Sequence, residues 1–310
     1  MEQFLKYFYS IYVEHVFKTQ ENYYFYYNEC LYQIIESNRT KDELYDINEI
    51  ISILKKDDYP ISEFVFNNFN EIISNYDDKN YILLKINCNL SNDVDLIAII
   101  NLQARISINN KYNKLYRNNW GNLWEKKIDY FEYQIKELGH NKPIILNSFS
   151  YFVGMAENAI SLVNYASIKS HLNSSLVISH KRINYPNMEL DYYNPLNLII
   201  DLNVRDISGY LKSMFFYSDR KTVLDRLNMY LKSTRITEYE ANMLFGRLLY
   251  PSYYFDIYES VIEDKKDEEE LLMIINKVNE YELFLKDVFV ILSKYYNIER
   301  VEWIINKKEL

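Results

Sequence analysis

The segment that decides the fold class is His180-Lys181-Arg182-Ile183-Asn184-Tyr185-Pro186-Asn187, together with the later apolar stretch Leu196-Asn197-Leu198-Ile199-Ile200-Asp201. Asn187 lies five residues after Arg182, and Asp201 ends the apolar stretch. The short apolar run predicts a buried strand that presents Asp201 at its end. A purely structural interpretation is also open: His180 then ends a strand with its ring hydrogen-bonded, Asn187 lies in a turn, and Asp201 caps the next helix.

The spacing of these polar residues is that of a phosphotransferase catalytic loop. In such a loop an aspartate two residues after the histidine accepts the proton of the substrate hydroxyl. An asparagine five residues later holds a metal ion, and a following strand delivers a second metal-binding aspartate. Here Arg182 occupies the position of the proton acceptor. A guanidinium stays protonated and only donates hydrogen bonds, so Arg182 cannot act as a general base.

Five ordered blocks of the chain carry a resemblance to a known family. They are Trp120-Gly121-Asn122-Leu123-Trp124 with Ile128-Asp129-Tyr130-Phe131-Glu132; Ala156-Glu157-Asn158-Ala159-Ile160; His180-Lys181-Arg182-Ile183; Asn194-Pro195-Leu196 through Asp201 with Arg205-Asp206-Ile207; and Arg247-Leu248-Leu249-Tyr250-Pro251 with Tyr253-Tyr254-Phe255. In these blocks the chain resembles the spore-coat-associated kinase-like family of the YutH and CotS type, within the aminoglycoside and choline phosphotransferase superfamily. The N-terminal part resembles that family only in architecture.

The resemblance implies a two-lobed, α+β, protein kinase-like fold. Residues 1–88 would form a small N-lobe of β-sheet plus one helix, which is a degenerate nucleotide-binding lobe. Residues 89–310 would form a larger, mainly helical C-lobe with a degenerate catalytic loop at 180–201.

Three residues near this loop would have structural roles by the same resemblance. His180 would be one of them. Asp206, at the start of a helix, would hold the backbone of the loop, and Arg205 would tie an acidic residue nearby. The alternative for Asp206 is a plain capping role at the helix N-terminus.

Local patterns agree with this order of elements. Aromatic and branched residues predict strands at 23–27 and 31–35, and apolar residues at helical intervals predict a helix from Asp42 to Lys55. Two more strands are expected, one around Phe64 to Ile73 with Asn67-Asn68 as a turn signal, and one around Tyr81 to Cys88. Beyond residue 89 helical patterns dominate, with expected helices at about 120–138, 153–168 and 205–216, and with a capping box at Thr237-Glu238-Tyr239-Glu240. The first of these helices is expected to bury one face, formed by Trp124, Ile128, Phe131, Ile135 and Leu138.

Composition and charge limit the possible partners. The formal net charge is −9 and the basic residues are scattered, which argues against nucleic acid as a partner. No targeting signal or membrane span is recognisable, so we expect a cytoplasmic protein that does not bind membranes. Cys30 and Cys88 have neither the spacing of a disulfide framework nor that of a zinc site. We therefore expect no bound metal and no other cofactor.

The nucleotide side of a kinase site lacks its usual residues in this chain. None of the five glycines precedes Gly121, so residues 1–88 contain no glycine-rich loop in which backbone amides could cradle a phosphate. By the resemblance, Gln33 stands where the phosphate-binding lysine is expected. With Arg182 in place of the base, three catalytic parts are missing, and losing the base alone costs about 10²–10⁴-fold in rate.

The identity of residue 182 suggests that the Arg182 side chain occupies the metal-binding position of the site. A bidentate ion pair of Arg182 with Asp201 would put a guanidinium where a metal ion would otherwise bind. The alternative is that Arg182 points to solvent or to a backbone carbonyl.

We therefore expect a pseudokinase without catalytic residues that is a structural or scaffold component of the bacterial endospore coat. It would be made in the mother-cell cytoplasm and deposited on the spore coat, with other spore coat proteins as partners. The rival hypothesis is an active ATP-dependent small-molecule phosphotransferase of the aminoglycoside or choline kinase type. In that case Glu49, Asn187 and Asp201 would bind nucleotide and Mg²⁺, and another carboxylate would replace Arg182, with Asp191 the nearest candidate.

Overall fold

The computed structural model of the chain describes residues 1–19, 22–87, 94–108, 110–169, 176–185 and 188–308. Packing divides the chain into two compact units. Unit 1 comprises Met1–Tyr116, Val177–Arg182 and Asn187–Ile200, and unit 2 comprises Arg117–Leu176, Ile183–Pro186 and Asp201–Leu310. The lobe boundary expected between residues 88 and 89 falls in a segment outside the described residues, so it stays a prediction.

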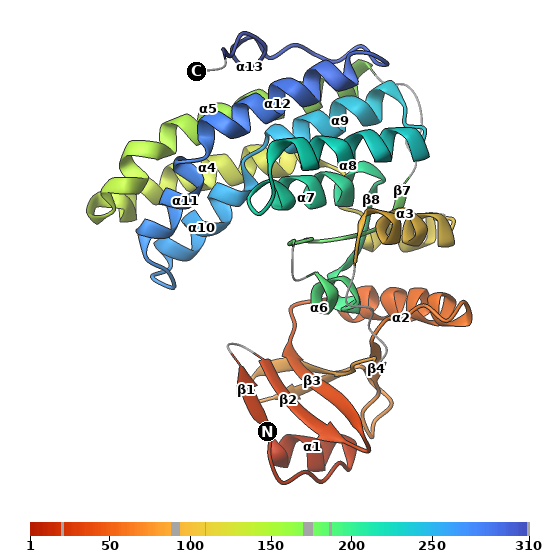
Figure 1. Cartoon of the computed structure of the whole chain (residues 1–310). Coiled ribbons are helices and arrows are strands. Elements are labelled where there is room, and N and C mark those ends of the chain that lie inside the picture. Colours follow the sequence, from red (N-terminus) through yellow and green to blue (C-terminus); the bar gives the residue numbers. More distant parts are fainter. Residues whose placement is uncertain (20–21, 88–93, 109, 170–175, 186–187, 309–310) are drawn as a thin grey trace. The chain divides into compact units, whose positions relative to one another are not determined.

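Unit 1 is built on a six-stranded antiparallel sheet (Figure 1). Its strands are β1 (Phe17–Thr19), β2 (Asn22–Tyr27), β3 (Cys30–Glu36), β4 (Glu63–Val65), β5 (Ile73–Tyr76) and β6 (Lys79–Lys85). The strand order is β1-β2-β3-β6-β4, and β5 also pairs with β6. Asn28 and Glu29 join β2 to β3, and Asp77 and Asp78 join β5 to β6, with φ values from 47° to 61°. Two consecutive positive φ values are typical of type I′ turns, whose twist matches that of the paired strands.

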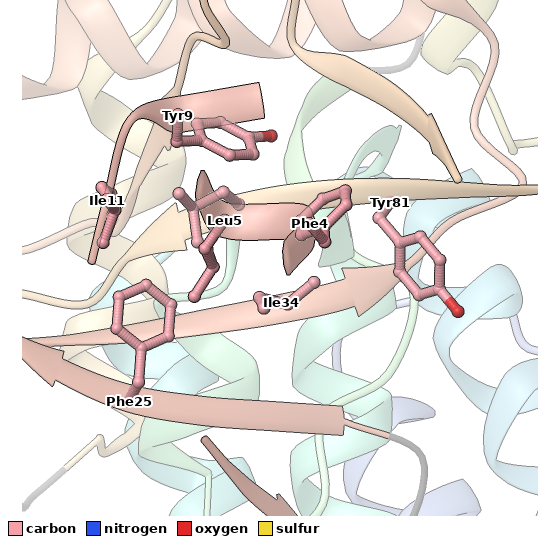
Figure 2. Packing of buried hydrophobic residues seen from close by; sticks show 8 residues of the cluster. Phe4, Leu5, Tyr9, Ile11, Phe25, Ile34 and Tyr81 are labelled. Carbon is pink, nitrogen blue, oxygen red and sulfur yellow. The ribbon is translucent and has the colours of Figure 1, made fainter. Parts of the chain in front are cut away.

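Helix α1 (Glu2–Tyr9) packs against this sheet (Figure 2). The buried cluster that joins them consists of Phe4, Leu5, Tyr9, Ile11, Phe25, Ile34, Tyr81 and Leu83. The sequence predicts only one helix in residues 1–88, so α1 is a correction. Its signal was present in the sequence, because Phe4 and Phe8 lie one helical turn apart, as do Leu5 and Tyr9.

The predicted helix at 42–55 is confirmed as α2 (Lys41–Lys56). It begins with a capping box in which the Thr40 hydroxyl accepts from the Glu43 amide and the Glu43 carboxylate accepts from the Thr40 amide. A separate two-stranded sheet pairs β7 (Leu176–His180) with β8 (Leu198–Leu202). Unit 1 also contains α3 (Leu96–Arg105), η1 (Asn110–Leu115), α6 (Glu189–Tyr192) and η3 (Pro195–Asn197).

Unit 2 is helical (Figure 1). Its helices are α4 (Trp120–Leu138), η2 (Gly139–Asn141), α5 (Pro143–Lys169), α7 (Val204–Phe215), α8 (Arg220–Ser233), α9 (Glu238–Leu249), α10 (Ser252–Ile262), η4 (Glu268–Leu271), α11 (Leu272–Ile275), α12 (Val278–Leu292) and α13 (Glu302–Ile305). Helices α5 and α9 approach closely at Gly246, where a Cβ atom would lie 2.6 Å from the Val163 Cγ1 atom. The predicted capping box of α9 is confirmed, with Thr237 and Glu240 as its two residues.

The turn signal at Asn67-Asn68 is confirmed, because a loop separates β4 from β5 there. The Asn67 side-chain carbonyl accepts from the Phe69 and Glu71 amides at 2.9 and 3.0 Å and so holds this loop. One local prediction is wrong: Leu138, expected on the buried face of α4, is 56% exposed at the last residue of the helix.

In the part of the chain that the structure describes, no helix is both long enough and apolar enough to cross a lipid bilayer.

Candidate functional site

His180 lies at the end of β7. Its side chain is buried, its ring stacks on Tyr192 with centroids 4.4 Å apart, and its Nε2 atom lies 3.0 Å from the Tyr192 carbonyl oxygen. Since a carbonyl only accepts hydrogen bonds, Nε2 carries the ring proton. The Tyr192 hydroxyl in turn donates to the Ala98 carbonyl at 3.0 Å. His180 therefore ties α6 to β7, and Tyr192 ties α6 to α3.

Asn197 holds the loop that contains Arg182, and sequence reasoning missed this role. Its amide nitrogen donates to the carbonyls of Arg182 and Asp191 at 2.8 and 3.1 Å, and its carbonyl accepts from the Arg182 amide at 3.3 Å. The only signal of this role in the sequence was that Asn197 is a polar residue inside the otherwise apolar stretch from Leu196 to Ile200. These bonds therefore hold the backbone of Arg182, at the position of the missing base, and that of Asp191.

The charge of Arg182 acts on the carboxyl group of Asp191. Arg182 is exposed. Partial burial raises the pKa of the Asp191 carboxyl, while the charges of His180 and Arg182 act in the opposite direction. A carboxylate is thus present near the position of the missing base, on α6.

Arg39 is a second residue that sequence reasoning missed. It is buried just before α2, and its Nη2 atom donates to the carbonyls of Leu196 and Leu198 at 2.9 and 2.6 Å. Its Nη1 atom lies 3.3 Å from a Glu43 carboxylate oxygen. One guanidinium therefore fixes the backbone that leads into β8, the strand that carries Asp201.

Asp201 is fully buried and hydrogen-bonded through both carboxylate oxygens. The indole nitrogen of Trp120 donates to both oxygens at 3.0 Å, and the Leu202 amide donates to Oδ1 at 2.7 Å. Arg205, in the first turn of α7, forms an ion pair with Oδ2. A pairing of Asp201 with Arg182 stays a prediction, and Arg205 is the ion-pair partner that the structure gives to Asp201.

Arg247 adds a second guanidinium to this site. Its central carbon lies 4.6 Å from the centroid of the Trp120 ring, which is the geometry of a cation–π contact. Burial lowers the pKa of Arg247 to about 9, and the charge of Arg205 acts in the same direction, whereas Asp201 and Asp206 oppose the shift. Asp206 is itself buried in the first turn of α7, where the helix dipole favours a carboxylate.

Three of the five sequence blocks meet at Asp201. The block at 120–124 supplies Trp120, the block at 194–207 supplies Asp201 and Arg205, and the block at 247–251 supplies Arg247. Burial raises the pKa of the Asp201 carboxyl, while Arg205, Arg247 and the Trp120 hydrogen bond favour its ionised form. The result is a closed network of charges and hydrogen bonds inside unit 2.

Gln33, at the expected lysine position, and Glu49, the candidate for nucleotide binding under the rival hypothesis, have partners of their own. The Gln33 amide nitrogen, on β3, donates to the Tyr24 hydroxyl on β2 at 2.8 Å. Glu49, on α2, pairs with Lys111 and accepts from the Tyr112 hydroxyl at 3.1 Å. The bond from Lys111 lowers the pKa of Glu49. Asn187 lies outside the described residues.

This arrangement does not fit a bound Mg²⁺ ion at Asp201. Mg²⁺ needs carboxylate oxygens that are free to enter its coordination shell, and it usually keeps several waters. Both oxygens of Asp201 accept hydrogen bonds from the protein, and its side chain has no exposed surface. Among the described residues, no group of three His, Cys, Asp or Glu side chains is placed to hold a metal ion.

The fold is that of the aminoglycoside phosphotransferases. An aminoglycoside phosphotransferase from Alicyclobacillus acidocaldarius superposes with a TM-score of 0.64 at 9% identity, covering 91% of this chain and 93% of that one. The AMP-bound spectinomycin phosphotransferase APH(9)-Ia gives 0.60 at 12% identity over 93% and 96%, and the amicoumacin kinase hAmiN gives 0.57 at 11% over 96% and 94%. These similarities confirm the predicted α+β, kinase-like fold.

The family is shown by the sequence itself. Residues 2–288 match the family described as "Spore coat putative kinase YutH". The endospore coat-associated protein YutH of Bacillus subtilis (strain 168) is 25% identical over 297 residues, which cover 84% of each chain. The chain therefore belongs to the YutH family of spore coat proteins with a kinase-like fold.

Proposed function

We propose that this protein does not transfer phosphate and that it serves as a structural or scaffold component of the endospore coat, where it binds other coat proteins. The observation that carries the proposal is that Asp201 is buried and paired with other groups of the protein. The residue that corresponds to a metal-binding aspartate of a kinase is buried and fully engaged by Trp120, Leu202 and Arg205.

Opening this site for a metal ion would be costly. The Trp120 indole and the Arg205 guanidinium would both have to leave Asp201, and the removal of one partner from a buried ion pair costs about 3–5 kcal/mol. The identity of Arg182 at the base position and of Gln33 at the lysine position supports the same conclusion. A protein of this family without turnover would act through the surfaces that it presents.

The coat setting is carried over from the relative of this chain. The Bacillus subtilis relative is described as endospore coat-associated. For this chain we propose the same location, with synthesis in the cytoplasm of the mother cell and deposition on the coat of the forming spore.

The first test is thermal unfolding of the purified protein with ATP, with Mg²⁺ and with both. A ligand at 100 times its dissociation constant would stabilise the native state by about 2.7 kcal/mol, which raises the midpoint measurably. We expect no Mg²⁺-dependent rise, while a working aminoglycoside phosphotransferase measured in parallel shows one. A clear Mg²⁺-dependent rise in this protein would contradict the proposal.

The second test asks whether the loop that contains Arg182 is needed for deposition on the spore coat. Arg182→Ala changes the base position on an exposed side chain, so the fold should remain intact. We expect the variant to be recovered from the spore coat in the same amount as the wild type. Loss of coat deposition with an unchanged thermal midpoint would show that this loop is needed for function.

A second candidate function, an ATP-dependent small-molecule phosphotransferase, is favoured by one observation. The carboxylate of Asp191 lies near His180 and Arg182, and burial raises its pKa, as suits a general base. Under this function Asp191→Asn would abolish ATP-dependent phosphorylation of amines and alcohols such as aminoglycosides or choline. No phosphorylation by the wild type in the same assay would exclude those substrates and support the scaffold proposal.

A further inference from the structure

Helix α4 has two faces with different partners. Its inner face carries Trp120, Trp124, Ile128 and Phe131, all buried, and Trp120 reaches Asp201 from there. Two polar contacts mark the flanks of the helix. Lys127 pairs with Glu259 of α10 at 2.8 Å, and Glu125 accepts from the Asn164 side chain of α5 at 2.8 Å.

Between these flanks runs an exposed stripe, which we call the outer seam. It consists of Leu123, Lys126, Tyr130, Tyr133 and Glu137, all of them exposed. Leu123, Tyr130 and Tyr133 are 51%, 54% and 63% exposed, which is unusual for three large apolar or aromatic side chains on one helix face.

The spacing of the outer seam is that of a coiled-coil seam. Its residues follow one another at intervals of three, four, three and four, the pattern of alternating a and d positions in a heptad repeat. With 3.6 residues per turn they lie within an arc of about 80°. The Gln134 side chain donates to the Tyr130 hydroxyl at 2.9 Å, which anchors this phenol on the helix. The outer seam therefore has the residue spacing of a helix-pairing surface, with one of its aromatic side chains held in place.

We propose that the outer seam binds the same seam of a second copy of this chain, with the two α4 helices antiparallel. The argument is charge complementarity. An antiparallel pair centred between residues 131 and 132 places Lys126 opposite Glu137 of the second copy, and it does so twice because of the two-fold symmetry. The same register places Tyr130 opposite Tyr133, so the centre of the interface is aromatic and its ends are oppositely charged. Aromatic pairs in the centre and opposite charges toward the rim are typical of protein interfaces.

The proposed dimer is weak in solution. One helix on each side contributes about four turns of contact, which buries less than the roughly 1,200 Å² of a standard stable interface. We expect association that depends on protein concentration and that strengthens when many copies are held close together, as on a coat surface. The proposal does not depend on whether the Asp201 site is inactive, because the outer seam lies on the other face of the helix.

Sedimentation analysis over a range of protein concentrations tests the proposal by charge exchange. Lys126→Glu places two glutamates opposite each other at both ends, and Glu137→Lys does the same with two lysines, so each variant alone should dimerise at least about tenfold more weakly than the wild type. An equal mixture of the two variants should associate like the wild type, because the glutamates of one variant then meet the lysines of the other at both ends. The doubly exchanged variant should also associate. Lys136→Glu changes an exposed charge outside the seam and is the matched control.

The outcomes separate this interface from others. The antiparallel register is supported if the mixture of Lys126→Glu and Glu137→Lys dimerises like the wild type and the Lys136→Glu control does so too. The proposal is overturned if the wild type stays monomeric at every concentration or if the single variants dimerise like the wild type. It is equally overturned if Lys136→Glu weakens the dimer as much, or if the mixture fails to associate. Circular dichroism and the thermal midpoint of each variant establish that the fold is intact.

Discussion

Replacing Asp201 by asparagine keeps the size of the side chain and removes its charge. The Arg205 side chain is 14% exposed and would lose its ion-pair partner inside the protein. Arg247, on the face of Trp120, would lose the same counter-charge. In addition, the new amide nitrogen is a donor, and it would meet the donors of Trp120 or Arg205 instead of an acceptor.

We expect Asp201→Asn to lower the free energy of unfolding by about 3–5 kcal/mol, the cost of leaving a buried charge without its partner. For a chain of this size the thermal midpoint would fall by about 5–8 °C. In a kinase whose metal-binding aspartate is unpaired without the metal ion, the same substitution would raise the free energy of unfolding, because it removes an unpaired buried charge.

The measurement is urea unfolding at neutral pH, followed by circular dichroism and tryptophan fluorescence. Asp191→Asn is the matched control, since burial raises the pKa of Asp191 and the neutral amide should be tolerated within about 0.5 kcal/mol. An unchanged or increased stability of Asp201→Asn would refute the view that Asp201 is locked by its protein partners.

Three further perturbations follow from the packing and the buried phenols. Arg39→Met leaves two buried backbone carbonyls without their donor and should cost about 2–4 kcal/mol in urea unfolding, whereas Arg39→Lys should recover part of it. Gly246→Ala puts a methyl group 2.6 Å from Val163 Cγ1 and should cost about 1–3 kcal/mol, unless α5 and α9 can separate at no cost. Burial raises the pKa of Tyr9 and of Tyr254 to about 12, so the folded state keeps these protons between pH 10 and 12 while the unfolded state loses them. The contribution of each buried phenol to the free energy of unfolding is therefore fully present below pH 10, and it falls by up to about 3 kcal/mol per residue as the pH rises to 12. A phenolate absorbance titration in which all tyrosines of the folded protein ionise near pH 10 would contradict this.

The sequence predicted those elements whose signals are local. Helix α2 was predicted within one residue at each end, because its apolar residues recur at helical intervals. The capping box of Thr40 and Glu43 at its start was found only in the structure. The β2–β3 pair was predicted from its aromatic and branched residues. The turn between β4 and β5 was predicted from Asn67-Asn68, but the sequence did not show that the Asn67 side chain would hold it through bonds to the Phe69 and Glu71 amides.

Local sequence patterns could not predict which residues pair with one another at the candidate site. Trp120 and Asp201 are 81 residues apart, and Arg39 and Leu198 are 159 apart, yet each pair is hydrogen-bonded. A side chain shows its type in the sequence but not which distant backbone or carboxylate it will meet. For this reason the sequence offered Arg182 as one possible partner of Asp201, which stays a prediction. It expected Arg205 to tie an acidic residue nearby, and only the structure identifies that residue as Asp201.

By itself the sequence determined the family, the absence of a carboxylate at position 182 and the absence of glycine before residue 121, because these depend only on residue identity and spacing. The tertiary structure alone decided that Asp201 is buried against an indole and a guanidinium. It also decided that the α4 stripe from Leu123 to Glu137 stays exposed. Burial and pairing arise from packing between segments that are far apart in the chain, and packing of this kind is fixed only when the whole fold forms.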